Sequence, residues 1–332
     1  MSRYAVDSAR PTDSLSSSSE NTHASETSRG EAKPAGATSG GRGARRGLKS
    51  TVLVIGSRTR AIAAVATALI ASRYQAVLAL SHKDTREPRQ TRSKRCFLLP
   101  SSHSEGYIEA LLSVARCAGA SVVVPTEHVS MWLAANARQQ FVDCGIALIA
   151  PEPDVLELCR DRRRLLERLE TVVPVPGGHL VPGGPEAWFV RKRDSFRGDT
   201  ARIVAGSRGA PTSEFDEEHA VEYLSGEEIW VDVVRGADGS VQTGQSNLVN
   251  RGGRARLVGP TPEDELVRSF SVKAAGAIDL VGHATVRFRC DFNGDPRVID
   301  VMPGFVSSSI DESGALTAIV QSVLDAPVGV LE

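Results

Sequence analysis

The stretch TVRFRCDFNGDPRVIDVM (Thr285–Met302) contains two β-strand patterns separated by a turn signal. Apolar and polar residues alternate on both sides of Asn293-Gly294, and Asn-Gly between alternating residues is the strongest short-range signal for a β-hairpin. The sequence therefore predicts strands over residues 285–291 and 297–302, joined by a two-residue turn at Asn293-Gly294.

This turn also predicts which residues face one another. Counting pairs outward from the turn places Arg289 opposite Val298 and Arg287 opposite Asp300. Because side chains alternate between the faces of a strand, we expect a mixed face and an apolar core face. The mixed face holds Thr285, Arg287, Asp300 and Met302, and the core face holds Val286, Phe288, Ile299 and Val301. We expect the mixed face to border a cleft or solvent.

Asp300 on the mixed face has two chemical interpretations. Its oxygens could hold a divalent cation. Alternatively, its carboxylate could pair with Arg287 across the hairpin, a contact worth about 0.2–1 kcal/mol if it is exposed. On these residues alone the ion pair is favoured, because a single carboxylate makes a poor Mg²⁺ site.

Composition argues against several classes of protein. The 332-residue chain has 39 Lys+Arg and 40 Asp+Glu residues, so there is no overall electrostatic case for binding nucleic acid or a membrane surface. No apolar run approaches the roughly 18 residues that a membrane helix requires. The five cysteines are scattered without metal-ligand spacing, which is typical of a reducing compartment. We therefore expect a cytoplasmic protein without nucleic-acid or membrane partners.

The N-terminal part of the sequence changes character near residue 48. Residues 1–48 are rich in Ser, Thr, Gly, Ala and charge, and cannot bury enough apolar surface to offset their ordering entropy, so we predict a disordered tail. Residues 49–152 alternate strand and helix patterns, which predicts a small Rossmann-like α/β domain with a parallel sheet covered on both faces. The expected strands are 51–56, 76–79, 121–125 and 145–149, and the expected helices are 61–70 and 107–118.

The pattern changes again after Pro153. Residues 154–169 predict one helix with many basic residues, and the following chain contains strands and hairpins, including 188–191 and 228–234. This half is therefore expected to be α+β with antiparallel strand pairing.

The order of these features resembles the ATP-grasp superfamily, in particular the carboxylate-amine ligases related to the large subunit of carbamoyl-phosphate synthetase. The resemblance extends over most of residues 51–320. Its most specific part is VEYLSGEEIWVD (Val221–Asp232), which is similar to the family's E-Y-L-x-G-x-E-x-x-V-D segment. It implies an ATP-grasp domain over residues 153–332, with a lid subdomain at about 180–240, preceded by the α/β domain at 49–152.

The resemblance assigns the nucleoside part of an ATP site to this segment. By resemblance, Glu222, Tyr223 and Leu224 supply the hinge that pairs with adenine, and Glu228 contacts the ribose.

The resemblance also places basic residues at the phosphates. Arg162 follows Asp161 at a helix start, as the family's Lys or Arg does, although the charge run 160–164 also fits a solvated helix face; both interpretations stay open. On the next strand, an ungapped match selects Arg191 as the nucleotide contact, whereas Lys192 requires a shift of one residue.

The family's glycine-rich flap over the phosphates corresponds here to DSFRGDT (Asp194–Thr200), which has one glycine, Gly198. Glycine lets a backbone approach phosphate closely, so this segment departs from the family. Arg197 could replace backbone donors with a guanidinium group, whereas Asp199 would repel phosphate.

The stretch VIDVMPGF (Val298–Phe305) resembles the family's E-x-N-P-R motif, whose Glu and Asn hold Mg²⁺ together with a Gln or Glu on the partner strand. Asp300 keeps the carboxylate, Met302 replaces the Asn, and Arg287 takes the partner-strand position. A thioether is too soft for Mg²⁺, and a guanidinium cannot ligate a cation. We therefore expect Arg287 to occupy the space that a cation would fill beside Asp300.

The resemblance implies an ATP-dependent ligase that joins a small-molecule carboxylate to an amine through an acyl phosphate, with ATP and Mg²⁺ as cofactors. The alternative is a degenerate ATP-grasp protein that binds nucleotide or a partner without catalysis. The departures at the flap, Arg287 and Met302 all affect phosphate and metal chemistry, whereas the hinge is kept. Catalysis is slightly favoured because most proteins of this fold are enzymes, and a homodimer is left open.

Overall fold

The computed structural model describes residues 50–56, 60–81, 95–177, 187–192, 201–205, 218–236, 238–249, 255–257, 262–304 and 320–321. The chain divides into two compact units, Met1–Arg46 and Gly47–Glu332, and every described residue lies in the second unit. The predicted disordered tail at 1–48 lies outside the described residues and stays a prediction.

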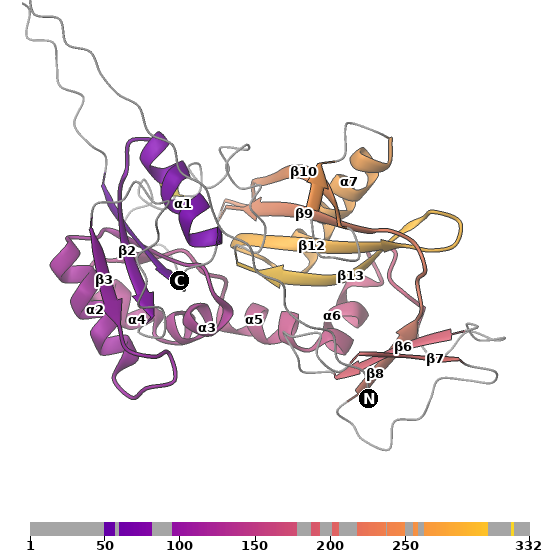
Figure 1. The fold of residues 1–332 in the computed structure, drawn as a ribbon, viewed down its shortest axis with the longest axis horizontal. Helices are drawn as coiled ribbons and strands as arrows, with labels where there is room; N and C mark the ends of the chain where they lie inside the picture. Colours follow the sequence, from indigo (N-terminus) through magenta and orange to yellow (C-terminus); the bar gives the residue numbers. More distant parts are fainter. Residues whose placement is uncertain are drawn as a thin grey trace, which may run out of the picture. The chain divides into compact units, whose positions relative to one another are not determined.

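Five parallel strands form the first sheet, in the order β3-β2-β1-β4-β5. Its strands β2 and β3 lie side by side in Figure 1. The elements are β1 (Thr51–Gly56), α1 (Arg60–Ala71), β2 (Gln75–Ser81), β3 (Cys96–Leu99), α2 (Tyr107–Ala118), β4 (Val122–Pro125), α3 (His128–Asn136), α4 (Arg138–Asp143) and β5 (Ala147–Leu148). Helix α1 packs on one face of the sheet, whereas α2, α3 and α4 pack on the other. Burial on both faces explains the nearly continuous apolar runs in these strands, and the α/β prediction is confirmed.

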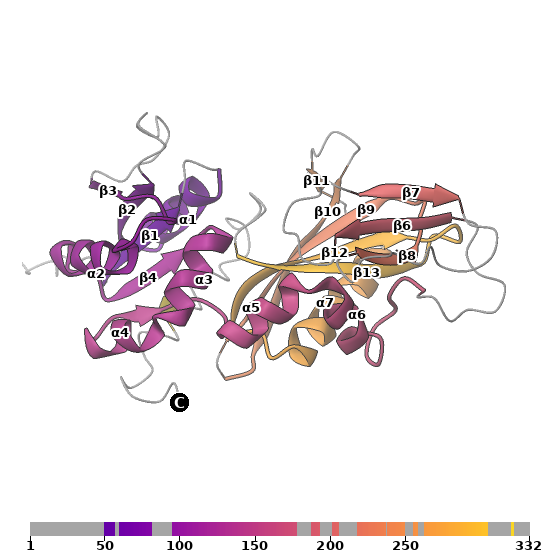
Figure 2. The same ribbon diagram turned by 90° about the horizontal axis from the view of Figure 1, so that it is seen from below.

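The second sheet is antiparallel, in the order β11-β10-β9-β12-β13. Its strands are β9 (Glu228–Arg235), β10 (Val241–Val249), β11 (Ala255–Leu257), β12 (Gly282–Cys290) and β13 (Pro296–Pro303). Helices α5 (Pro153–Arg160), α6 (Arg162–Leu169) and α7 (Pro262–Ala277) cover one of its faces (Figure 2). A third sheet has the order β7-β6-β8, with β6 (Ala187–Lys192), β7 (Arg202–Ala205) and β8 (Glu218–Glu222). The α+β prediction is confirmed as well.

The single helix predicted over 154–169 is wrong, because the chain forms two helices there. Asp161 leaves the helical region (φ −89°, ψ 93°), and its carboxylate accepts a hydrogen bond at 3.2 Å from the backbone N–H of Arg164. This is an N-cap, which satisfies a backbone donor at the start of a helix. The cap lies inside a continuous helical pattern, so periodicity alone did not detect it, whereas the resemblance correctly placed a helix start at Arg162.

The β12–β13 hairpin closes through a longer loop than the predicted two-residue turn. The backbone N–H of Gly294 donates to the carbonyl of Asp291 at 3.1 Å, and Gly294 has φ +89°, which favours glycine. This is the arrangement of a three-residue hairpin loop. The pairing next to the loop is therefore shifted by one residue, so Arg289 lies opposite Arg297 and not Val298.

A register irregularity further along the hairpin restores the predicted pairing. The register shifts between Arg287 and Phe288, and Arg287 lies opposite Asp300 as the sequence predicts. Val298 now joins Phe288 in the core, and Ile299, predicted on the core face, lines a pocket instead. The irregularity therefore decides which β13 side chains reach the candidate site.

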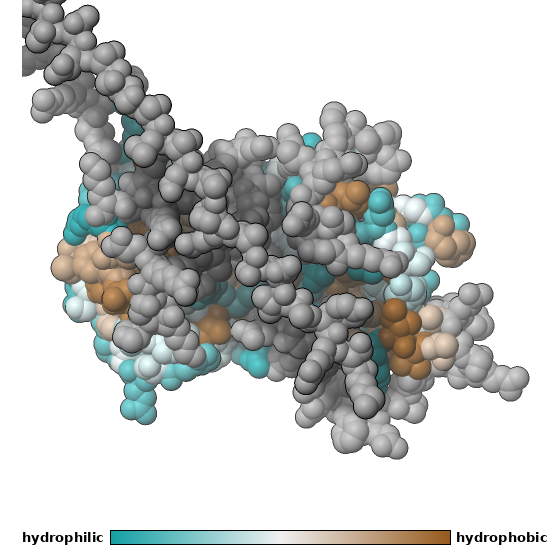
Figure 3. Space-filling view, viewed as in Figure 1, coloured by the Kyte–Doolittle hydropathy of each residue, from teal (hydrophilic) through white to brown (hydrophobic). Residues whose placement is uncertain are grey.

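The face of the protein shown in Figure 3 carries hydrophobic residues in separate patches between hydrophilic ones. Among the described residues, no helix has the length and apolar character needed to cross a bilayer.

Candidate functional site

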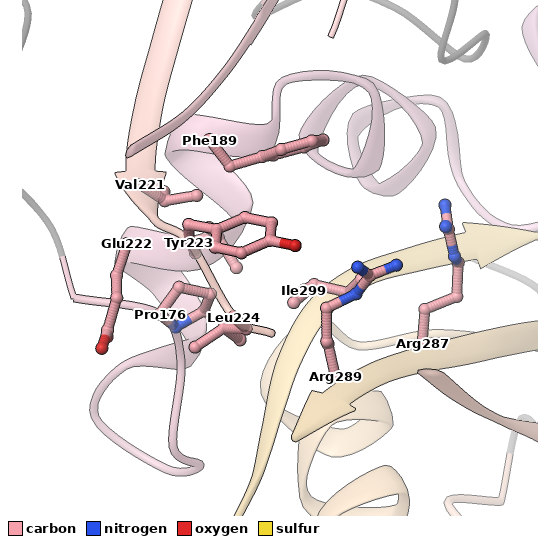
Figure 4. A pocket seen from close by; sticks show the side chains of 10 residues that line it. Pro176, Phe189, Val221, Glu222, Tyr223, Leu224, Arg287, Arg289 and Ile299 are labelled. Atoms are coloured by element: carbon pink, nitrogen blue, oxygen red, sulfur yellow. The ribbon is translucent and has the colours of Figure 1, made fainter. Parts of the chain in front are cut away.

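A pocket lies between the strand–hinge segment around β6 and β8 and the β12–β13 hairpin (Figure 4). It encloses about 490 Å³, part of it open to solvent. Its wall is mainly apolar and aromatic, formed by Leu166, Pro176, Phe189, Tyr223, Leu224 and Ile299. Two guanidinium groups, from Arg287 and Arg289, enter it from the hairpin. A largely apolar pocket with a few convergent polar groups is the usual form of a small-molecule site.

The predicted hinge residues Glu222, Tyr223 and Leu224 all line this pocket. The Glu222 carboxylate accepts a hydrogen bond at 3.1 Å from the backbone N–H of Gly177, and Figure 4 shows it turned away from the two arginines. The Tyr223 hydroxyl instead points toward the arginines (Figure 4). Tyr223 and Leu224 therefore contribute the aromatic and aliphatic surface, whereas Glu222 ties the segment to the loop before β6.

Glu228 holds the two pocket arginines in place. Its Oε1 accepts from Arg287 Nε at 2.9 Å, and its Oε2 accepts from Arg289 Nη2 at 2.6 Å. The indole Nε1 of Trp230 also donates to Glu228 Oε1, at 2.7 Å. The resemblance implied a ribose contact for Glu228; in the structure its carboxylate is bound by two guanidinium groups and an indole.

The electrostatic state of Glu228 follows from these contacts. Burial by itself would raise the pKa of this carboxyl group. The positive charge of Arg287 and the hydrogen bonds from Trp230, Arg287 and Arg289 outweigh burial and lower the pKa. Glu228 is therefore held ionised as an anchor for the arginines.

Asp300 is bound by two guanidinium groups as well. Its Oδ2 lies 3.4 Å from Arg162 Nε and Nη2 and 3.4 Å from Arg287 Nη1. The Asp300 and Arg162 side chains are 3% and 6% exposed. The ion pair favoured by the sequence is therefore present, with Arg162 as a second partner, and the solvated-face interpretation is wrong for Arg162.

Burial also shifts the pKa values of two further groups near Asp300, His128 and Cys159. Burial lowers the pKa of His128, an effect that the charges of Asp300 and Glu127 partly offset. Burial raises the pKa of the Cys159 thiol, and the charge of Asp300 adds to this effect. Both shifts favour the neutral forms of these groups, whereas Arg162 and Arg287 bring positive charge to Asp300.

The opposite end of the mixed face is also buried. Met302 lies opposite Thr285, which is fully buried and whose hydroxyl donates to Asp232 Oδ1 at 2.7 Å. The expectation that the mixed face borders a cleft is therefore met at Arg287, which lines the pocket, and wrong at Thr285 and Asp300.

The residues beside Asp300 do not fit a Mg²⁺ ion. Mg²⁺ requires near-octahedral oxygen coordination, whereas the Asp300 oxygen is bound by two guanidinium groups and Met302 offers a thioether. No group of three or more His, Cys, Asp or Glu residues placed to hold a metal ion occurs in the described part of the chain.

Three predicted contacts remain open. Arg191 and Lys192 end β6, where they pair with His219 and Glu218, but the description there is limited to the backbone. Gly198 and the flap around it lie outside the described residues. These residues stay predictions.

Sequence reasoning missed six residues that line the pocket, Leu166, Pro176, Phe189, Val221, Arg289 and Ile299. Arg289 could have been found, because it is two positions from Arg287 and alternate positions of a strand share a face. Ile299 could not, because its place depends on the register shift in the hairpin.

No family model and no curated protein matches this sequence, but solved structures do. A biotin carboxylase from Campylobacter jejuni, in a beta-gamma-ATP complex, superposes with a TM-score of 0.65 and 16% identity over 84% of this chain and 72% of that one. An L-amino acid ligase from Bacillus licheniformis superposes with a TM-score of 0.61 and 13% identity, over 84% of this chain and 75% of that one. N5-carboxyaminoimidazole ribonucleotide synthetase from Thermotoga maritima superposes with a TM-score of 0.60 and 15% identity, over 86% of this chain and 78% of that one. At identities this low, the superpositions show a shared fold alone.

Proposed function

Because this chain has the ATP-grasp fold that its sequence predicted, we propose that it binds ATP in the pocket and uses ATP to join a carboxylate to an amine. The pocket is the observation that carries the proposal, since an aromatic and aliphatic wall ends at two guanidinium groups. A purine base matches the wall, and phosphate oxygens match the planar donors of arginine. The neighbours described as a beta-gamma-ATP complex and as an L-amino acid ligase support the nucleotide and the reaction class.

The residues of the pocket divide into two roles in this proposal. Phe189, Tyr223 and Leu224 hold the base, and Arg287 and Arg289 hold the phosphates. Glu228 and Asp300 pair with these arginines, and Glu222 also lines the pocket, so the attraction for a polyanion comes from the N–H donors of Arg287 and Arg289 and not from a net charge.

Phosphoryl transfer depends mainly on positioning and on electrostatic stabilisation of the transferred group. Fixed guanidinium groups can supply that stabilisation, and the described residues offer this charge in place of a metal site. The substrate carboxylate would attack the terminal phosphorus to give an acyl phosphate and ADP, and the amine would then displace phosphate from the acyl carbon.

One observation favours a second function, nucleotide binding without catalysis. Asp300 is already bound by Arg162 and Arg287, so the position where the family holds its metal is closed by ion pairs. In this case the protein would retain the hinge and act as a nucleotide-dependent binding module.

The binding part of the proposal is tested by calorimetry with ATP and adenosine. Phe189→Ala removes an aromatic wall of the pocket and should weaken both ligands by about 10-fold or more. Phe292→Ala is the matched control, because Phe292 is 83% exposed at the hairpin loop and does not line the pocket. Equal affinity of wild type and Phe189→Ala for both ligands would contradict the placement of the base.

The reaction is tested by ADP release with panels of carboxylates and amines. The ligase proposal predicts ADP release that requires a carboxylate, and a hydroxamate product when hydroxylamine replaces the amine. ATP binding without carboxylate-dependent ADP release across the panels would support the binding-module function instead. Absence of ATP binding would contradict both.

A further inference from the structure

The two pocket arginines are held in fixed positions by protein contacts. Glu228 accepts from both, and the Arg287 guanidinium carbon also lies 5.6 Å from the centre of the Trp230 ring, within cation–π range. Their side chains are 21% and 33% exposed, so both remain open to the pocket. An anion that enters the pocket therefore meets guanidinium groups whose orientation is already set.

The hydrogen bonds described leave donors on both arginines. An arginine side chain has five N–H groups. Among the described residues, Arg287 donates from Nε and Nη2 to Glu228 and from Nη1 to Asp300, and Arg289 donates from Nη2 to Glu228. Six of the ten N–H groups of the pair therefore have no hydrogen bond to the described residues and can bind a ligand in the pocket.

Arg287 also connects the pocket to the position beside Asp300. Its Nη1 lies 3.4 Å from Asp300 Oδ2, while the rest of the same guanidinium group binds Glu228. A divalent cation beside Asp300 would therefore have to displace both Arg287 and Arg162 from a carboxylate that is 3% exposed. Displacing buried ion-pair partners is costly, so the structure favours arginine over a metal ion at this place.

We propose that the pocket recognises a nucleoside diphosphate or triphosphate without a divalent cation, with Arg287 and Arg289 binding the phosphate oxygens. This inference rests on the proposed nucleotide function, and it specifies how that site neutralises the phosphate charge. The base lies on the apolar wall, and the two guanidinium groups replace the charge that Mg²⁺ would bring. Arg289 makes the larger contribution, because it is more exposed and makes fewer protein contacts than Arg287.

The test is calorimetry of the full chain with ADP and adenosine, in EDTA and in excess Mg²⁺. The expected affinity for ADP in EDTA equals that in Mg²⁺ within about threefold. Arg289→Gln should weaken ADP in EDTA by about 10- to 100-fold, the range for charge-assisted hydrogen bonds, and leave adenosine unchanged. Arg289→Lys keeps the positive charge but lacks the planar guanidinium group, so it should lose less affinity for ADP than Arg289→Gln does.

Arg297→Gln is the matched control. Arg297 is in the same hairpin, is 34% exposed and pairs with Asp291 at 3.0 Å, but it does not line the pocket. It should bind ADP like wild type, and thermal melting of each variant shows whether it is folded. If Arg289→Gln does not fold, the comparison of Arg289→Lys with wild type decides the phosphate role.

The outcomes separate this inference from the proposed function. ADP binding that requires Mg²⁺ would overturn metal-independent recognition while the nucleotide function stands. Equal losses of ADP and adenosine in Arg289→Gln would assign Arg289 to the base and overturn its phosphate role. No binding of ADP or adenosine in either buffer would overturn the nucleotide function itself.

Discussion

Arg162 and Asp300 are 138 positions apart in the sequence, and the Arg162 guanidinium lies 3.4 Å from the Asp300 carboxylate in the interior. Arg162 is the first residue of α6, immediately after the Asp161 cap, and Asp300 lies in β13. This ion pair joins a helix start to the hairpin and places positive charge beside a carboxylate that could otherwise hold a cation.

Asp300→Asn should destabilise the fold. The substitution leaves the buried guanidinium of Arg162 without its counter-charge, and breaking a buried ion pair costs about 3–5 kcal/mol. The free energy of unfolding from denaturant titration measures this loss. Glu167→Gln is the control, since it breaks an exposed pair with Arg163 and should change stability by less than about 1 kcal/mol. Similar small effects of both substitutions would mean that Arg162 finds other partners.

Glu228 should make stability depend on pH in the acid range. Its folded pKa lies below the ordinary value of about 4.3, so its contribution is complete above that value and is lost as pH falls through the lower folded pKa. Glu228→Gln should therefore be less stable than wild type at pH 7, and the difference should shrink toward pH 3. Denaturant titration at several pH values measures it, and a difference that stays constant with pH would contradict the assignment.

Arg191→Ala should weaken ATP by about 10- to 100-fold and leave adenosine nearly unchanged. The ungapped match to the family selects Arg191 as the nucleotide contact, and the group that the substitution removes would face phosphate and not the base. Lys192→Ala is the internal control at the next position. Calorimetry compares the two, and a larger effect at Lys192 would show that the match to the family is displaced by one residue.

The double substitution Arg287→Gln with Met302→Asn should introduce Mg²⁺ dependence into ADP binding. Both changes place amide oxygens near Asp300, and oxygens are the ligands that Mg²⁺ prefers. The readout is the ratio of ADP affinities in Mg²⁺ and EDTA, which should rise above that of wild type. Each single substitution is a control, because each supplies one oxygen. An unchanged ratio in the double variant would show that Arg162 alone excludes the cation.

The hairpin shows how far local sequence patterns predict structure. Alternation and the Asn-Gly signal correctly placed Arg287 opposite Asp300. The loop is nevertheless longer than predicted, and the later register shift compensates for it. The longer loop and the register shift cancel at the pair Arg287–Asp300, but residues between the loop and this pair lie on other faces than predicted. Ile299, predicted in the core, lines the pocket instead. Turn length and bulges depend on packing against neighbouring strands, which local alternation does not encode.

The sequence by itself determined the α/β and α+β halves, because these follow from residue periodicity, a property of short segments. The fold was expected from the resemblance of ordered motifs such as Val221–Asp232 to a known family, and the superposed structures share it. Only the tertiary structure decided that Arg162 is buried against Asp300 and that Arg289 shares a pocket with Tyr223. These contacts join segments that are far apart in the chain, and their geometry depends on how helices and sheets pack around one core.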